Sequence, residues 1–185
     1  MFAAFLAPPP VWRTPSLAEL LGVAAFGVLC LWVHWFSADG WVWLVDNADL
    51  AIHEAGHPLL GILSRRLSVY GGTLFQLLFP ALTLWHFRHR GEATGAAAAA
   101  VWLGQNGLNI ARYMADARAQ VLPLVGGGEH DWTEIFQRWG VLQSDSRIAG
   151  LTALASAALI VYSLRWLYLR WRQGAALDTI AKLEP

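Results

Sequence analysis

Apolar residues form five long runs along the chain, most of them close to the roughly 20 residues that a helix needs to cross a bilayer. The runs cover residues 17–36, 41–64, 74–87, 94–117 and 148–169. One long loop, residues 120–147, lies between the last two runs. No internal repeat divides them. The pattern predicts an all-α fold, a polytopic membrane helix bundle that forms a single domain over residues 1–185.

Composition supports the membrane prediction. The chain is 56% hydrophobic and 14% charged, with a mean hydropathy of +0.41, whereas soluble domains are about 45–50% apolar and about 25% charged. We therefore expect contact with membrane lipid. The net charge is zero and no large cluster of Lys and Arg occurs, so nucleic acid is excluded as an expected partner. The sequence does not specify an oligomeric state.

Polar residues concentrate in the second and fourth runs. An ionisable side chain at bilayer depth costs several kcal/mol by most scales, so it indicates a functional site. The second run contains Asp46, Asn47, Asp49, His53, Glu54 and His57, and the fourth contains Gln105, Asn106, Asn109, Arg112 and Asp116. Two helices with facing polar sides could enclose a wet or metal-filled site.

The stretch "LAIHEAGHPLL" contains the H-E-x-x-H pattern of zinc hydrolases. His53 and His57 are four residues apart, which is about 40° around a helix and roughly 6 Å along it, so both imidazoles can bind one zinc ion. Glu54 stands beside the first histidine, where it can act as the general base. A polar network or a proton path is the non-metal alternative.

Pro58 follows the second histidine directly. Its missing N–H frees the carbonyl of Glu54, and its ring disfavours helical geometry at His57. The helix is therefore predicted to kink or end there. Irregular backbone is tolerated at membrane depth where it lines a cavity, so the site remains compatible with this proline.

The motif His53, Glu54 and His57, in its apolar setting, resembles the site-2 protease group of intramembrane zinc metalloproteases. The resemblance is restricted to the motif and its flanks. It implies zinc as cofactor, Glu54 as the catalytic residue and a distant aspartate as third ligand. Those proteases usually carry this aspartate in an N-P-D-G or L-D-G sequence, and neither occurs in this chain.

A wider pattern, "GGTLFQLLFP", "GQNGLNIARYMADARAQ" and "GGGEHDW", is similar to a set of bacterial membrane proteins of unassigned function. This second resemblance implies location in a bacterial inner membrane. It implies no activity.

The third zinc ligand has three candidates, since a catalytic zinc usually has three protein ligands and one open position. His130 is favoured, because imidazole is a good zinc donor and glycines 126–128 would let a re-entrant loop return to the bundle. Asp131 is an alternative ligand, or it orients His130 from outside the metal site. Asp116 would imitate the site-2 protease aspartate, although Arg112 one turn earlier offers it a competing partner.

Amide side chains near the motif have two interpretations. Gln76, Asn106 and Asn109 could contact substrate or stabilise an oxyanion, or they could make hydrogen bonds between helices. "GGTLFQ", at the start of the third run, could form an edge that holds extended substrate, as in site-2 proteases. For this segment we favour a flexible interfacial turn at Gly71 and Gly72.

These features predict a membrane-embedded zinc metallohydrolase, a peptidase that cleaves a membrane protein or a membrane-proximal peptide. The rival class is a non-catalytic membrane metal-binding protein with a structural, sensory or transport role, or a subunit of a larger assembly. A third class is a metal-dependent enzyme that acts on a lipid or another small molecule. Glu54 separates the first two classes, because a structural metal site has no need of a base.

Overall fold

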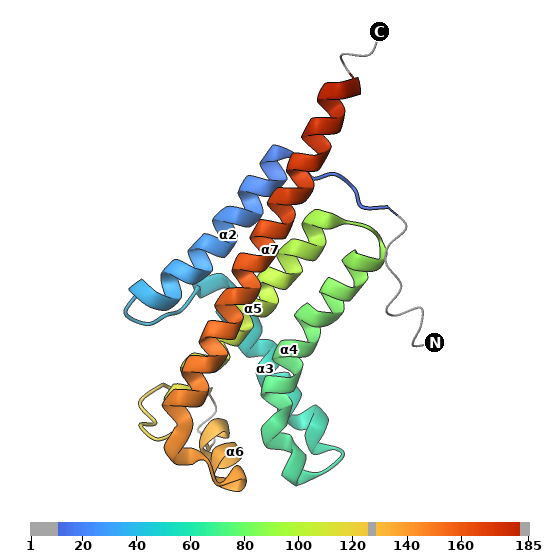
Figure 1. The fold of residues 1–185 in the computed structure, drawn as a ribbon. Helices are drawn as coiled ribbons and strands as arrows, with labels where there is room; N and C mark the ends of the chain where they lie inside the picture. The colour runs from blue at the N-terminus through green and yellow to red at the C-terminus, as the bar shows by residue number, and fades with distance from the viewer. Residues whose placement is uncertain (1–10, 126–128, 182–185) are drawn as a thin grey trace.

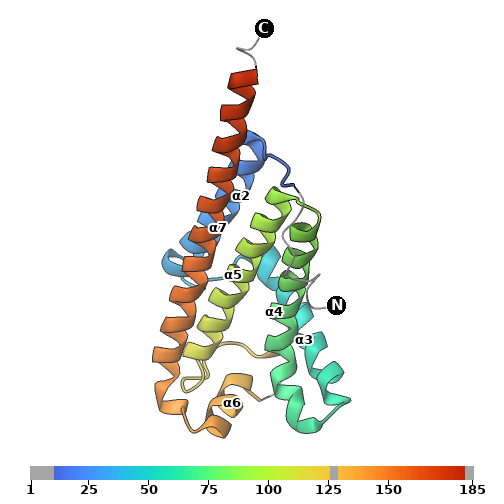
Figure 2. The same ribbon diagram turned by 45° about the vertical axis from the view of Figure 1, so that its right-hand side comes forward.

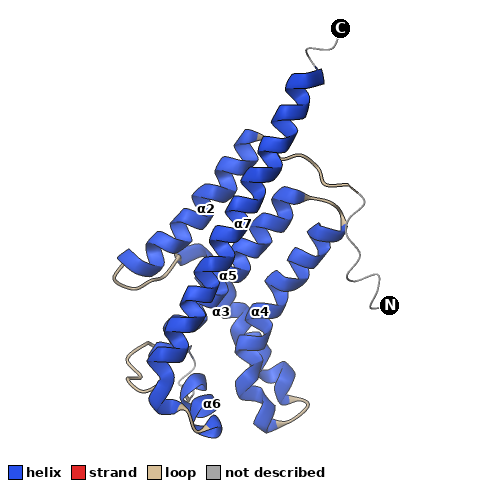
Figure 3. Ribbon diagram, viewed as in Figure 1, coloured by secondary structure: helices blue, strands red, loops and turns tan. Residues whose placement is uncertain are grey.

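The computed structural model describes residues 11–125 and 129–181, and every regular element in these ranges is a helix (Figures 1 and 3). The predicted all-α class is therefore confirmed. The elements are α2 (Leu17–Phe36), α3 (Trp43–Gly61), α4 (Arg65–His89), α5 (Ala93–Ala115), α6 (Asp131–Trp139), the 3-10 turn η2 (Leu142–Ser144) and α7 (Asp145–Ala181).

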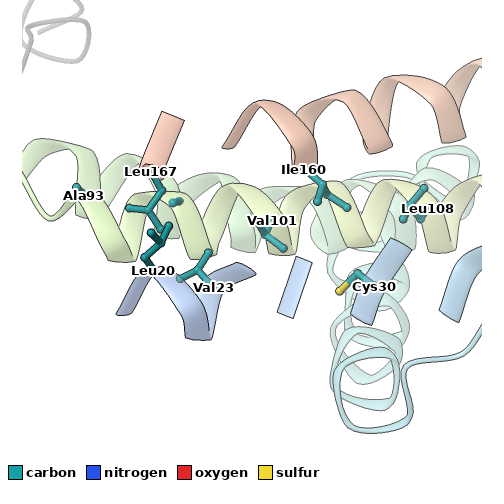
Figure 4. Packing of buried hydrophobic residues seen from close by; sticks show 9 residues of the cluster. Leu20, Val23, Cys30, Ala93, Val101, Leu108, Ile160 and Leu167 are labelled. Carbon is teal, nitrogen blue, oxygen red and sulfur yellow. The ribbon is translucent and has the colours of Figure 1, made fainter. Parts of the chain in front are cut away.

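Helix α5 is the centre of the bundle. Fourteen of its 23 residues are buried, and it packs against α2, α4 and α7, as Figure 2 shows. Glycines on α5 let α7 approach closely, because a Cβ at Gly104 would fall on the Ile160 side chain and one at Gly107 on Ser156. The main core cluster contains Leu20, Val23, Cys30, Ala93, Ala97, Val101, Leu108, Ile160 and Leu167 (Figure 4).

Helices α3 and α4 touch backbone to backbone. A Cβ at Gly56 would overlap the carbonyl of Gly71, and a Cβ at Gly71 would overlap the carbonyl of Gly56. Small residues at a crossing are the usual way for membrane helices to approach so closely. The glycine inside the H-E-A-G-H motif therefore joins α3 to α4.

Helix α6 lies at the same end of the bundle as the turn between α3 and α4 (Figures 1 and 2). Its apolar face enters a second core cluster, which contains Val69, Ile110, Met114, Ala117, Trp132, Ile135, Phe136 and Ala149. Gly140 ends the helix in the left-handed region, with φ 68°, which glycine adopts without steric cost. Asp131, the first residue of α6, is thereby held against the rest of the bundle.

Among the described residues, three helical stretches are long and apolar enough to cross a membrane: Leu17–Phe36, Arg65–His89 and Leu142–Ala176. They expose large apolar side chains such as Val28, Leu78 and Leu154. The predicted count of five spans is not confirmed. Helix α3 contains the polar motif, and α5 directs most of its side chains into the bundle.

The observed start of α4 differs from the predicted start of the third apolar run. Helix α4 begins at Arg65, not at residue 74, because Ser64 accepts a hydrogen bond from the Arg66 N–H at 3.2 Å and caps the helix. Gly71 and Gly72 thus lie inside a helix and form neither a turn nor an extended edge.

Two further predictions concern Pro58 and the loop over residues 120–147. Helix α3 continues beyond Pro58 to Gly61, so of the two predicted outcomes, a kink or an end, the helix does not end at this proline. The predicted loop over residues 120–147 contains α6 and η2. Glycines 126–128, expected to form a re-entrant turn, lie outside the described residues.

The crossing of α3 and α4 can be tested with Gly56→Ala. The added methyl group must push the two backbones apart, so we expect a loss of stability of about 1–3 kcal/mol or more, measured by thermal unfolding in detergent. Gly150→Ala on α7 is the control, because no atom lies within 4 Å of a Cβ there. Equal stability of the two variants would contradict the backbone contact.

Candidate metal centre

Two histidines of α3 and one aspartate of α6 meet at a single point. The Nε2 atom of His53 lies 2.9 Å from Oδ2 of Asp131, and the Nε2 atom of His57 lies 3.3 Å from the same oxygen. One donor atom from each residue falls within 4.8 Å of the others. His53 and Asp131 are buried and His57 is half-buried. This cluster could hold a metal ion.

The other ring nitrogens of both histidines contact carbonyl oxygens. Nδ1 of His53 lies 3.1 Å from Oε1 of Gln76, and Nδ1 of His57 lies 2.9 Å from the backbone oxygen of Ser68. A carbonyl oxygen only accepts hydrogen bonds, so we assign the proton of each ring to Nδ1. A neutral imidazole with this tautomer presents the lone pair of Nε2 to Asp131, and it donates a hydrogen bond to the carboxylate only when Nε2 also carries a proton. A cation at this point, either that proton or a metal ion, satisfies the converging groups, and the cluster could hold a metal ion.

A chain of hydrogen bonds through α5 and α4 connects Asp46 to His53. Asn109 donates from Nδ2 to Oδ1 of Asp46 at 3.2 Å, and Gln105 donates to the same oxygen. Asn109 in turn accepts from Nε2 of Gln76 at 3.1 Å. Because the Asp46 carboxylate only accepts hydrogen bonds, Asn109 must direct its NH2 group at Asp46 and its oxygen at Gln76. Gln76 must then direct its own NH2 group at Asn109. Gln76 therefore presents its oxygen to His53.

Helix α4 also provides space and a second anchor for the histidines. A Cβ at Gly72 would fall on the imidazole ring of His53, so this ring fits only because residue 72 is glycine. Ser68 donates from Oγ to the backbone oxygen of His57 at 3.0 Å. The last turn of α3, which contains Pro58, is thus tied to α4 by contacts in both directions.

His130, the favoured third ligand, lies outside the metal cluster. Its Nδ1 accepts from the backbone N–H of Thr133 at 3.3 Å and caps α6. Its Nε2 lies 3.3 Å from Oδ2 of Asp116, and its ring contacts Tyr113 with 4.1 Å between centroids. Nδ1 is therefore used by the helix cap, whereas Nε2 is buried and makes no regular hydrogen bond among the described residues. Of the three candidates, the structure places Asp131 with the two histidines, and His130 and Asp116 behind it.

The charge states at the start of α6 agree with this arrangement. Burial acts to raise the pKa of Asp131, but hydrogen bonds with His53 and His57 outweigh it and hold the pKa below its ordinary value. Burial lowers the pKa of His130, and the neighbouring Asp116 offsets this only in part. At neutral pH the carboxylate of Asp131 is therefore ionised and the imidazole of His130 is neutral.

Tyr113 is a site residue that the sequence reasoning missed. Its hydroxyl oxygen accepts from the backbone N–H of Asp131 at 3.1 Å, and its ring centroid lies 6.1 Å from that of His53. Asn109, Tyr113 and Asp116 share one face of α5 at spacings of four and three residues. That spacing is visible in the sequence and could have included Tyr113 with the two polar residues.

Two cavities meet at the cluster. The first, about 400 Å³, extends from His53 and Glu54 toward Arg112 and is walled by Trp41, Leu50 and residues 122–125. The second, about 560 Å³, reaches His57 and Asp131 from the other side, and its lining includes the charged residues Arg65, Arg66, Glu129, Glu134 and Arg138. His53, Glu54 and Tyr113 line both cavities.

Of the predicted residues, Glu54, Gln76 and Asn109 line a cavity, and Asn106 is not among the lining residues. Glu54 is partly exposed, and it makes no hydrogen bond or ion pair within the described part of the chain. Gln76 and Asn109 line the first cavity. Asn106 is fully buried and donates to the backbone oxygen of Trp102, one turn earlier on the same helix, at 3.0 Å.

Comparison with known proteins gives no match to this chain among family models, curated proteins or solved structures.

The identity of the third ligand can be tested by metal affinity. We expect Asp131→Ala and His53→Ala each to abolish metal binding, because each change deletes a donor atom. His130→Ala should weaken binding only about 10–100-fold, the usual effect of losing a residue that orients a ligand. Metal analysis and competition with a chelator measure both effects. Tight binding by Asp131→Ala together with complete loss in His130→Ala would reverse the assignment.

The orienting role of Gln76 has its own test. Gln76→Met keeps the length of the side chain but removes the acceptor for the Nδ1–H of His53, so metal affinity should fall about 10–100-fold. Gln137→Met is the matched control, because Gln137 is exposed on α6. If both variants bind metal as the native chain does, the hydrogen-bond chain does not orient His53.

Proposed function

We propose that this chain is a membrane-embedded zinc metallohydrolase, a peptidase that cleaves a membrane protein or a membrane-proximal peptide. His53, His57 and Asp131 hold the zinc ion, and Glu54 is the catalytic base. One observation supports this proposal above all others. Glu54, the residue after His53, has a carboxylate without a partner among the described residues. It lines both cavities that meet at the three converging donor atoms.

The donor set favours zinc with an open position. Catalytic zinc sites commonly contain three protein ligands drawn from His, Asp and Glu, and leave the fourth position to water or substrate. Two histidines and one carboxylate also bind iron in oxygenases. The glutamate adjacent to the first histidine belongs to the hydrolytic motif, since only hydrolysis needs a base at that position.

The residues of this chain divide the chemistry between them. Bound zinc would supply Lewis-acid polarisation of the scissile carbonyl and a lowered pKa for water. Glu54 accepts a proton from the attacking water and returns it to the leaving amine. Gln76 keeps Nε2 of His53 directed at the cluster, and Tyr113 holds the backbone of Asp131.

A peptide substrate is supported by the resemblance to site-2 proteases and by the cavity walls. Two histidines of an H-E-x-x-H motif with a distant aspartate are the donors that this resemblance implies. Here the aspartate would come from the short helix α6 and not from an N-P-D-G sequence. The first cavity offers apolar walls to a peptide, and the charged lining of the second offers a polar route for water.

Glu54→Gln separates hydrolysis from mere metal binding. The amide keeps the size and polarity of the side chain but cannot accept the proton, so cleavage should fall by several orders of magnitude while zinc is retained. We would incubate purified protein with a defined peptide mixture and identify products by mass spectrometry. Glu92→Gln, at the turn between α4 and α5, is the control for the loss of one carboxylate.

Two outcomes contradict the proposal. Cleavage that persists in Glu54→Gln excludes this residue as the base. A metal-loaded native chain that cleaves nothing, combined with a cellular phenotype that needs His53 but not Glu54, assigns the protein to the non-catalytic metal-binding class.

A further inference from the structure

The first cavity contains a cation that the proposed hydrolysis does not use. Among the residues that the structure describes, Arg112 is the only Lys or Arg that borders this cavity, which is also lined by His53 and Glu54. It lies on α5 three residues after Asn109 and directly before Tyr113. Three residues advance a helix by about 4.5 Å. Arg112 therefore lies about one helical turn from the amide chain that orients the metal ligand.

The Arg112 side chain is held in place by packing. Its guanidinium carbon lies 5.6 Å from the centroid of the Trp41 ring, within the range of a cation–π contact. Its Cδ atom lies so near Gly40 that a Cβ there would be 3.4 Å away. Gly40 has φ 59°, a backbone conformation that suits glycine. The loop between α2 and α3 thus forms a seat for this arginine.

The donors of the guanidinium have no acceptor in the described structure. Across residues 11–125 and 129–181, Arg112 makes no hydrogen bond and no ion pair, although it is half-buried. Asp39 borders the same cavity, but its Oδ1 accepts from Ser37 Oγ at 3.1 Å and from the Trp41 N–H at 3.2 Å. An arginine that is fixed in a cavity with unused donors is suited to bind a planar oxyanion.

We propose that Arg112 binds the free C-terminal carboxylate of a peptide substrate in the first cavity. The inference rests on the proposed peptidase function and specifies the end of the substrate that the site accepts. A cavity of about 400 Å³ lies near the lower end of the range for small-ligand sites. It suits a short chain end better than a continuing polypeptide. The apolar walls receive the terminal side chains, and the carboxylate pairs with the guanidinium fork.

The test measures binding apart from cleavage. N-acetyl-leucyl-leucine and its C-terminal amide are titrated by calorimetry into zinc-loaded Glu54→Gln protein in detergent. The acid should bind about ten- to a hundredfold more tightly than the amide, as expected for a hydrogen-bonded charge pair. Adding Arg112→Ala should reduce the affinity for the acid to that for the amide and leave the amide unchanged. Arg112→Lys should restore part of the difference, because it keeps the charge but loses the fork.

Controls exclude general effects of charge and folding. Arg90→Ala removes an exposed cation at the end of α4 and should leave the preference for the acid intact. Retained binding of the amide and of zinc shows that the Arg112→Ala protein is folded. Hexyl phosphate is a third probe. If it binds more tightly than the acid and depends on Arg112, the site recognises a phosphate headgroup and the peptide assignment is overturned.

The remaining outcomes separate this inference from the proposed function. Equal affinity for acid and amide, equal weakening of both by Arg112→Ala, or no binding of any probe overturns the carboxylate site. A preference for the acid that depends on Arg112, in a chain that cleaves no peptide when Glu54 is intact, supports the carboxylate site and contradicts hydrolysis. If the chain cleaves peptides but binds acid and amide with equal affinity, hydrolysis is supported and the carboxylate site is contradicted.

Discussion

The close contact between α3 and α4 is the constraint on which the candidate site depends. Only because Gly56 and Gly71 lack side chains can the two backbones touch. That approach brings Ser68, Gly72 and Gln76 of α4 against the two histidines of α3. The contact therefore determines which nitrogen of each imidazole faces the metal cluster. Packing and chemistry are joined at one helix crossing.

The other half of the site comes from α5 and α6. The apolar face of α6 fixes the helix against the bundle, and His130 and Tyr113 fix its first residue. Asp131 can then remain buried as a carboxylate, because two imidazoles meet it. Here the arrangement of residues follows a common rule for metal sites, in which residues behind the ligands set their orientation.

The sequence was sufficient to predict part of the candidate site. The spacing of His53 and His57 predicts their convergence from helix geometry alone. Their third partner could not be chosen in this way, because His130 and Asp131 are adjacent and only the capping contact with Thr133 separates their roles. Helix α6 was predictable from its apolar positions at 132, 135, 136 and 139, followed by Gly140. The count of five spans is not confirmed, because an apolar run does not reveal whether it faces lipid or another helix.

The separation of the donors along the chain has a consequence for biogenesis. His53 and Asp131 are 78 residues apart, so α3 is synthesised long before the carboxylate that it meets. During that interval the two histidines and Glu54 can contact helices such as α4 and α5, which are already made, but not the carboxylate of Asp131. The set of three donors is therefore incomplete until α6 emerges from the ribosome. Metal loading that needs all three donors would be a late step in maturation, after synthesis has passed the start of α6.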